Sequence, residues 1–243
     1  MTGMSDHAGR DRTPPPVVLV HGWGGSFDAT WRRSGFTELL ADAGRTVIGV
    51  DLLGHGDAPK PHDPEAYADL GARVVDAIDS SGSDVVDAVG FSLGALTLLR
   101  VAVDTPDRFR RLVLAGIGRN VFEHDPEQTE RIVAAIEGRG TDDDNRARLF
   151  AQYADRPDND PVALAAVLRS RIGAAFTPSD LAGVAVPTLV AVGDQDFVLP
   201  ADALVDALPD ASLRLLRRTD HFATPESFDF IDATLGFLDA APV

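Results

Sequence analysis

Residues 85–104 read VVDAVGFSLGALTLLRVAVD, and this stretch decides the fold. The apolar run 85–89 is typical of a strand that is buried on both faces, and residues 93–104 continue as a helix. Between them, Gly90 to Gly94 has the G-x-S-x-G pattern of a sharp strand-to-helix turn that exposes a serine. The two glycines let this turn form without clashes. The pattern alone is common, so its place between a strand and a helix carries the prediction that Ser92 is a nucleophile.

Further strands and helices alternate on both sides of this stretch. Short apolar runs predict strands at 17–20, 46–50, 111–115, 188–192 and 212–216. Helical patterns separate these runs, at 31–43, 67–80, 201–208 and 227–238. The alternation indicates an α/β fold, with a mostly parallel central sheet that is flanked by helices.

Residues 119–183 interrupt the alternation, because they are helical and charged and contain no convincing strand. Asp125-Pro126 and Asp160-Pro161 each place a capping aspartate before a proline, which is typical of a helix start. Ligands of open parallel sheets bind beyond the carboxyl ends of the strands. We therefore expect a core of residues 13–118 and 184–243, with residues 119–183 inserted as a helical cap over the strand ends.

A glycine-rich loop, His21-Gly22-Trp23-Gly24-Gly25, directly follows the strand at 17–20. Its glycines allow backbone N–H groups to face a cavity. The N–H of Trp23 is therefore expected to join the N–H of Leu93, which begins the helix after Ser92, in an oxyanion hole.

Two later loops supply a base and an acid. The sequence TDHF follows the strand at 212–216, and its histidine, His221, would take the proton of Ser92 and return it to the leaving group. The sequence GDQD follows the strand at 188–192 and contains two aspartates. Asp194 stands where the chain leaves the sheet, whereas Asp196 is carried further around the loop towards His221. Asp196 is therefore the expected acid, which would hold the imidazole and stabilise the imidazolium.

The motifs VHGWGG, DLLGHG and GFSLG, and the pair GDQD with TDHF, resemble those of the α/β-hydrolase superfamily from about residue 17 to residue 238. The resemblance implies a catalytic triad, no cofactor, and an eight-stranded sheet with one antiparallel strand and the cap after the sixth. It also implies that the acid closes a Gly-x-x-Asp pattern, as Asp196 does. The chain departs from the family before the first motif, because Pro14, Pro15 and Pro16 cannot form a regular strand. We therefore expect six to eight strands.

Composition limits the partners. The formal net charge of −16 disfavours nucleic acid and an anionic membrane surface. No apolar run reaches the roughly 18 residues of a membrane span, and residues 1–13 do not resemble a secretory signal, so a cytoplasmic location is expected. The chain has no cysteine, and no two histidines have metal-ligand spacing, so no metal is expected. His21 and His55 are interpreted as structural residues of their loops. The expected partner is a small-molecule substrate, with monomer and homodimer both left open.

Three functions fit these residues. The favoured one is a serine hydrolase that cleaves a small carboxylic ester, thioester or lactone through an acyl-enzyme. The second is a C–C bond hydrolase or lyase with the same triad, a branch to which the resemblance also extends, and the third is a ligand-sensing protein. Five residues of the insertion either face the pocket or pack the cap on the sheet: Phe150, Tyr153, Leu164, Leu168 and Phe176.

Overall fold

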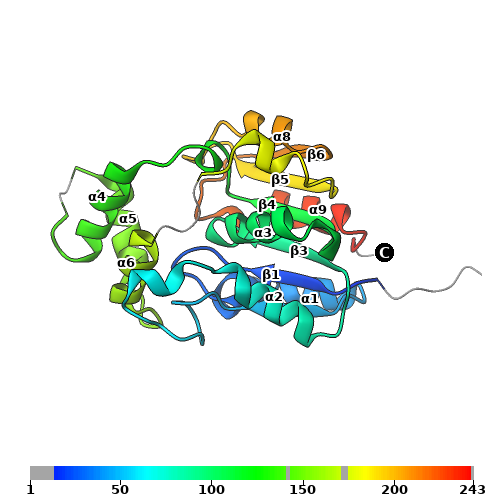
Figure 1. Cartoon of the computed structure of the whole chain (residues 1–243), viewed down its shortest axis with the longest axis horizontal. Coiled ribbons are helices and arrows are strands. Elements are labelled where there is room, and N and C mark those ends of the chain that lie inside the picture. Colours follow the sequence, from blue (N-terminus) through cyan, green and yellow to red (C-terminus); the bar gives the residue numbers. More distant parts are fainter. Residues whose placement is uncertain (1–13, 141–142, 171–174, 242–243) are drawn as a thin grey trace, which may run out of the picture.

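The central sheet has six strands, all parallel, in the order β2-β1-β3-β4-β5-β6 (Figure 1). The structure is a computed structural model, and it describes residues 14–140, 143–170 and 175–241. Each strand lies within two residues of a strand expected from the sequence, so the α/β fold is confirmed. The strands are β1 Val17–Val20, β2 Val47–Val50, β3 Val86–Phe91, β4 Phe109–Ala115, β5 Thr188–Gly193 and β6 Ala211–Leu216.

The strand count corrects one implication of the family resemblance. The described residues contain six parallel strands and not eight strands with one antiparallel. The segment before β1 consists of Pro14, Pro15 and Pro16, which have no backbone N–H to donate to a neighbouring strand. The expected start of the core, at residue 13, lies outside the described residues.

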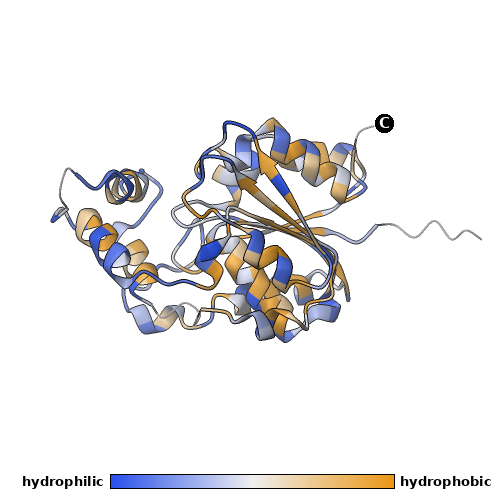
Figure 2. Cartoon of the chain, turned by 90° about the horizontal axis from the view of Figure 1, so that it is seen from above, coloured by the Kyte–Doolittle hydropathy of each residue, from blue (hydrophilic) through white to orange (hydrophobic). Residues whose placement is uncertain are grey.

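Alternate side chains of each strand enter two separate cores. In β1, Val17 and Leu19 join the apolar cluster that includes Trp31 and Phe230, whereas Val18 and Val20 join the cluster on the opposite face. Figure 2 shows the apolar strands between two layers of helices. One face is covered by α1 Phe36–Asp42 and α9 Phe228–Phe237, and the other by α2 Gly71–Ser80, α3 Leu93–Asp104 and α8 Asp202–Ala207.

Two of the expected helices are shorter than predicted. The helix expected at 31–43 is divided into a short π-helical turn, η1 Asp28–Arg32, and α1. Gly35 separates them with a φ of 78°, a left-handed conformation that glycine adopts without strain. The helix expected at 67–80 is likewise divided into a 3-10 turn, η2 Pro64–Tyr67, and α2.

The insertion between β4 and β5 is helical, as expected, and α4, α5 and α6 lie to one side of the sheet (Figure 1). Asp125 and Asp160 cap α4 and α6 through their side chains, at the two predicted helix starts. The helices of this segment are α4 Pro126–Ile136, α5 Asn145–Ala154, α6 Pro161–Arg169 and α7 Pro178–Leu181. The remaining 3-10 turns are η3 Pro106–Arg108, η4 Arg119–Val121 and η5 Thr224–Glu226. No helix in the described part of the chain is long and apolar enough to cross a membrane.

Candidate active site

Ser92 occupies a strained turn between β3 and α3. Its φ of 52° and ψ of −112° are unusual for a residue with a side chain. A Cβ on Gly90 would lie 2.7 Å from the backbone nitrogen of Ala95, and a Cβ on Gly94 would overlap the carbonyl of Val20. Larger residues would therefore push α3 away from β3 and β1. The two glycines are what allow the serine side chain to project from the sheet edge at the start of α3.

His221 connects Ser92 to Asp196. Its Nε2 lies 2.9 Å from Ser92 Oγ, and its Nδ1 lies 2.9 and 3.0 Å from the two carboxylate oxygens of Asp196. A carboxylate can only accept at Nδ1, so Nδ1 carries the proton and Nε2 is free to accept the Ser92 hydroxyl. The three side chains that the sequence places in three separate loops thus form one hydrogen-bonded chain.

The loops after β5 and β6 pack directly on each other, and this contact determines which of the two aspartates lies next to His221. A Cβ on Gly193 would overlap the carbonyl oxygen of Thr219, so only glycine allows the close approach. Asp194 stays at this junction, where its Oδ1 accepts from the backbone N–H of Thr219 at 3.3 Å. Asp196 lies beyond it and faces His221. The structure therefore places Asp196, and not Asp194, beside the imidazole.

The Asp196–His221 pair is shielded from water. Both residues are only 5% exposed. The ring of Phe197 lies 4.4 Å from the imidazole, and the ring of Phe91 lies 5.1 Å from it. Asp196 also accepts from the backbone N–H of Val198 at 3.1 Å, so one carboxylate oxygen is held by the backbone as well as by the histidine. A hydrogen bond in such surroundings is stronger than it would be in water.

Trp23 and Ser92 line the same cavity, and Leu93 directly follows Ser92 in the chain. Leu93 is the first residue of α3, where N–H groups have no acceptor within the helix. The N–H of Trp23 belongs to the same peptide unit as the carbonyl of Gly22, which accepts from His21 Nδ1 at 2.8 Å and from the Gly25 N–H at 3.0 Å. The carbonyl is held towards the core. In a trans peptide unit the N–H points in the opposite direction, so the Trp23 N–H points away from the core.

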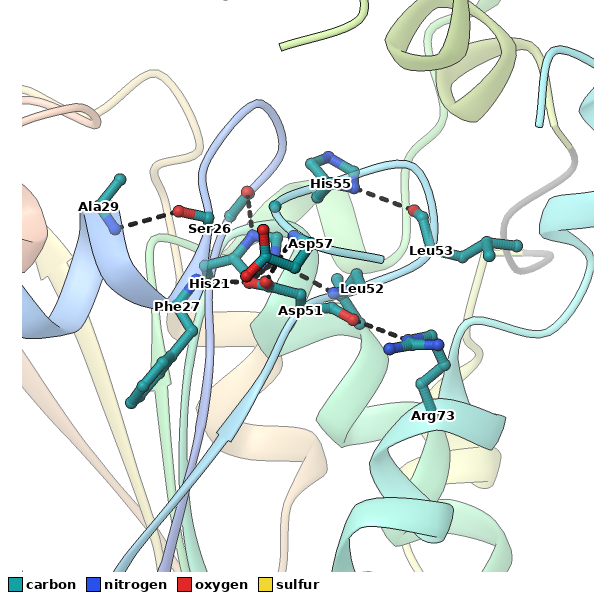
Figure 3. Close-up of polar contacts among 12 residues, drawn as sticks. His21, Ser26, Phe27, Ala29, Asp51, Leu52, Leu53, His55, Asp57 and Arg73 are labelled. Atoms are coloured by element: carbon teal, nitrogen blue, oxygen red, sulfur yellow. Dashed lines mark hydrogen bonds and ion pairs between the residues drawn. The ribbon is translucent and has the colours of Figure 1, made fainter. Parts of the chain in front are cut away.

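His21 is a buried structural residue, and Figure 3 shows the polar contacts around it. Its Nε2 accepts from the backbone N–H of Leu52 at 3.1 Å, so both ring nitrogens are occupied by backbone groups. Burial lowers its pKa, because it disfavours the charged ring. Asp51 nearby accepts from the N–H of Phe27 at 2.7 Å and from that of Asp57 at 2.8 Å, and so ties the loops after β1 and β2 together.

A cavity of about 250 Å³ opens above Ser92 and His221. Two of the five insertion residues singled out from the sequence, Phe150 and Tyr153, line it, and Leu164, Leu168 and Phe176 do not. The wall also contains residues that were not predicted to line it, among them Arg156, Glu226 and Phe222. The side chain of Trp23 also lines it, and its Nε1 donates to the carbonyl of Leu164 at 3.1 Å. Among the described residues, no group of three His, Cys, Asp or Glu side chains could hold a metal ion.

Comparisons with known proteins place these features in context. A family model described as alpha/beta hydrolase fold matches residues 15–143. A protein of Variovorax paradoxus (strain S110), named as a candidate carbamate hydrolase, is 31% identical, and the match covers 91% of this chain and 91% of that protein. A 2-hydroxy-6-oxo-6-(2'-aminophenyl)hexa-2,4-dienoic acid hydrolase of Metapseudomonas resinovorans is 30% identical, over 92% of this chain and 83% of that protein. Among solved structures, the enol-lactonase of Burkholderia xenovorans LB400 has the same fold, with a TM-score of 0.74, 22% identity, and coverage of 95% of this chain and 93% of that one.

Proposed function

The chain belongs to the α/β-hydrolase fold family, and we propose that it is a serine hydrolase that cleaves a small carboxylic ester, thioester or lactone through an acyl-enzyme. One observation carries this proposal. Ser92 Oγ lies 2.9 Å from His221 Nε2 in the wall of a cavity, and Asp196 accepts from the other imidazole nitrogen behind it. A hydroxyl, a base and a carboxylate in this arrangement are the groups that acyl transfer requires.

The geometry supports a two-step reaction. Ser92 Oγ attacks the carbonyl carbon of the substrate while its proton passes to His221 Nε2, and the imidazolium is stabilised by Asp196. The carbonyl oxygen becomes an oxyanion that the N–H groups of Trp23 and Leu93 stabilise. His221 then protonates the leaving alkoxide or thiolate as the carbon–oxygen or carbon–sulfur bond breaks. Water, activated by the same nitrogen, releases the acid from Ser92.

A covalent probe tests this function directly. A fluorophosphonate should label the wild-type protein, and Ser92→Ala should lose both the labelling and the turnover of p-nitrophenyl esters. Intact esterase activity in a correctly folded Ser92→Ala protein would contradict the proposal. Thermal unfolding of both proteins serves as the control for folding.

The cavity indicates a small acyl group. Its volume of about 250 Å³ is below the roughly 300–1,000 Å³ of drug-sized ligand pockets, and aromatic rings form much of its wall. Two of these rings, Phe150 and Tyr153, come from α5, and Arg156 comes from the turn after it. We propose on this basis that residues 119–183 act as a cap that completes the pocket. The charged side chains of Arg156 and Glu226 would then contact polar groups of the substrate.

A second candidate function is hydrolysis of a C–C bond next to a ketone. The relative at 30% identity that is named as a hydrolase of an oxo-dienoic acid favours it, because the match extends over 92% of this chain. The two candidates are separated by kcat/KM on one panel: p-nitrophenyl acetate and butyrate, lactones, thioesters and carbamates against a 2-hydroxy-6-oxo-dienoate. The ester proposal expects the first group to be preferred. Preference for the dienoate by tenfold or more would reverse the ranking.

A further inference from the structure

The loop that carries the Trp23 N–H is held from two sides. On the core side, His21 Nδ1 donates to the carbonyl of Gly22 at 2.8 Å. On the other side, the contacts come from the insertion: Asn159 Nδ2 donates to the carbonyl of Gly24, and Trp23 Nε1 donates to the carbonyl of Leu164, at 2.9 and 3.1 Å. Trp23 and its neighbour Gly24 are thus each hydrogen-bonded to a residue that is more than 130 positions later in the chain.

This loop requires an external restraint. Three of its five residues are glycines, and Gly24 has a φ of 71°, in a region that other residues rarely adopt. A glycine-rich segment loses much conformational entropy when it is fixed, so its geometry depends on the partners that hold it. Tyr153 packs so closely on Gly24 that a Cβ there would lie 2.7 Å from the tyrosine ring. The end of α5 therefore packs on the loop, and the turn that follows α5 donates to it.

Asn159 is positioned for this contact. It follows α5, in the turn before α6, and its backbone N–H donates to the carbonyl of Arg156 at 3.0 Å. Its Nδ2 donates at 2.9 Å to the carbonyl of Tyr153 as well as to that of Gly24. The side-chain amide therefore joins the end of α5 to the loop after β1, and no other residue type offers two donors on so short a side chain.

We propose that Asn159 is a positioning residue of the oxyanion hole, and that the insertion helps to set the direction of the Trp23 N–H as well as to cover the pocket. The proposal rests on the function proposed above. The carbonyl of Gly24 and the N–H of Gly25 belong to one peptide unit, and that N–H donates to the carbonyl of Gly22 at 3.0 Å. The Gly22 carbonyl in turn shares its peptide unit with the Trp23 N–H. Without the Asn159 donor, this chain of contacts loses its restraint from the insertion, and the direction of the Trp23 N–H is less firmly set. The variant should therefore stabilise the oxyanion less well. Because the oxyanion forms in the transition state, this loss lowers kcat and leaves substrate binding largely unchanged.

The test compares Asn159→Ala and Asn159→Asp with His62→Ala. Asn159→Asp keeps the shape but replaces the donor with an oxygen. His62 supplies the control, because its Nε2 lies 2.9 Å from Asp160 Oδ2 and so forms a polar contact between the core and the same turn, away from the oxyanion loop. We expect both Asn159 variants to lower kcat by about 10- to 100-fold, a part of the 10²–10³ that a lost oxyanion donor costs. KM should stay within about threefold and His62→Ala should keep wild-type kcat.

A second readout separates positioning from a loss of folding. The affinity for an aryl trifluoromethyl ketone, which forms a tetrahedral adduct with the serine, should fall in proportion to kcat, whereas the affinity for the product acid should not change. Unchanged kcat and unchanged ketone affinity in folded Asn159→Asp would overturn the proposal. An equal loss of kcat in His62→Ala would overturn it too, because the loss would then follow from any weakened contact between the core and the insertion and not from the Asn159 donor. Active Ser92→Ala would instead overturn the proposed function, whatever the Asn159 variants do.

Discussion

Two buried histidines stand at the same edge of the sheet, one after β1 and one after β6, and only one of them is suited to be a base. His21 is fully buried and His221 is 5% exposed, and both carry the proton on Nδ1. The difference lies in the partners. Nε2 of His21 accepts from the backbone N–H of Leu52, an amide that does not act as a nucleophile, whereas Nε2 of His221 accepts from the hydroxyl of Ser92.

The partners at Nδ1 differ as well. His21 donates to a neutral carbonyl, that of Gly22, and His221 donates to the carboxylate of Asp196. A carboxylate stabilises an imidazolium, and a carbonyl does so much less. Burial and the tautomer alone therefore do not distinguish a base from a structural histidine. What distinguishes His221 is a hydroxyl that can act as a nucleophile at Nε2 and a carboxylate at Nδ1.

The largest expected effect comes from the same substitution at both histidines. Asparagine keeps a donor near the position of Nδ1 and removes Nε2. We expect His221→Asn to lower kcat by about 10⁵-fold, in the range of a lost catalytic base. His21→Asn should lower it by at most about 100-fold, because it disturbs the loop of the oxyanion hole without removing a reacting group. Steady-state kinetics on folded proteins would check this. Similar losses in the two variants would remove the distinction between them.

The second effect tests the carboxylate partner. Asp196→Asn should lower kcat by about 10⁴-fold, because the amide no longer stabilises the imidazolium and favours the wrong tautomer. Asp194→Asn keeps an oxygen that can accept from the N–H of Thr219, so a loss within about tenfold is expected. The measurement is kcat on one p-nitrophenyl ester at constant pH. The reverse ranking would show that the carboxylate of Asp196 is not the acid that supports His221 in the reaction.

The smallest effect concerns stability. Burial and, to a smaller extent, the neighbouring His21 ring together lower the pKa of His55 from 6.5 to about 3. The unfolded chain therefore takes up the proton first as pH falls. The stabilisation by neutral His55 is complete above pH 6.5 and decreases by about 1.4 kcal/mol per pH unit below it.

Urea unfolding at pH 7.5 and 5.5 measures this contribution. The wild type should lose about 1.4 kcal/mol more than His55→Asn between the two values, because asparagine does not titrate. Asparagine can still donate to the carbonyl of Leu53, which accepts from His55 Nδ1 at 3.0 Å in the wild type. An equal loss in the two proteins would show that His55 is already protonated in the fold.

Much of the core could be predicted from the sequence, because its patterns are local. Short apolar runs such as VVLV in β1, LVAV in β5 and the LVLA end of β4 mark buried parallel strands well. The sharp turn at Ser92 needs small residues at Gly90 and Gly94, and the sequence contains them. Gly35, which divides the first expected helix, was also visible, since glycine is a poor helix former that often marks a helix boundary.

The insertion was harder to predict. In α5 the only buried residues are Ala147 and Ala154, two small side chains, so the apolar face of the helix is weakly marked. Asn159 and Arg156 lie in a polar turn, and nothing in their immediate sequence indicates that one donates to Gly24 and the other lines the cavity. Such contacts depend on how the insertion packs on the core. The only local signal was Asp160-Pro161, which locates the turn but not its partner.

The hydrogen bond between Asn159 and Gly24 also sets a rule for recombination. Residues 119–183 look like a cassette that could be exchanged among relatives to change the substrate, with crossover points after β4 and before β5. Of the two hydrogen bonds between the loop and the insertion, one runs from Trp23 Nε1 to a backbone carbonyl of α6, which any incoming sequence supplies. The other needs a side-chain amide at one position. A chimera without it would bind its new substrate and turn it over slowly, so a library of exchanged segments should be sorted first by the residue that stands in place of Asn159.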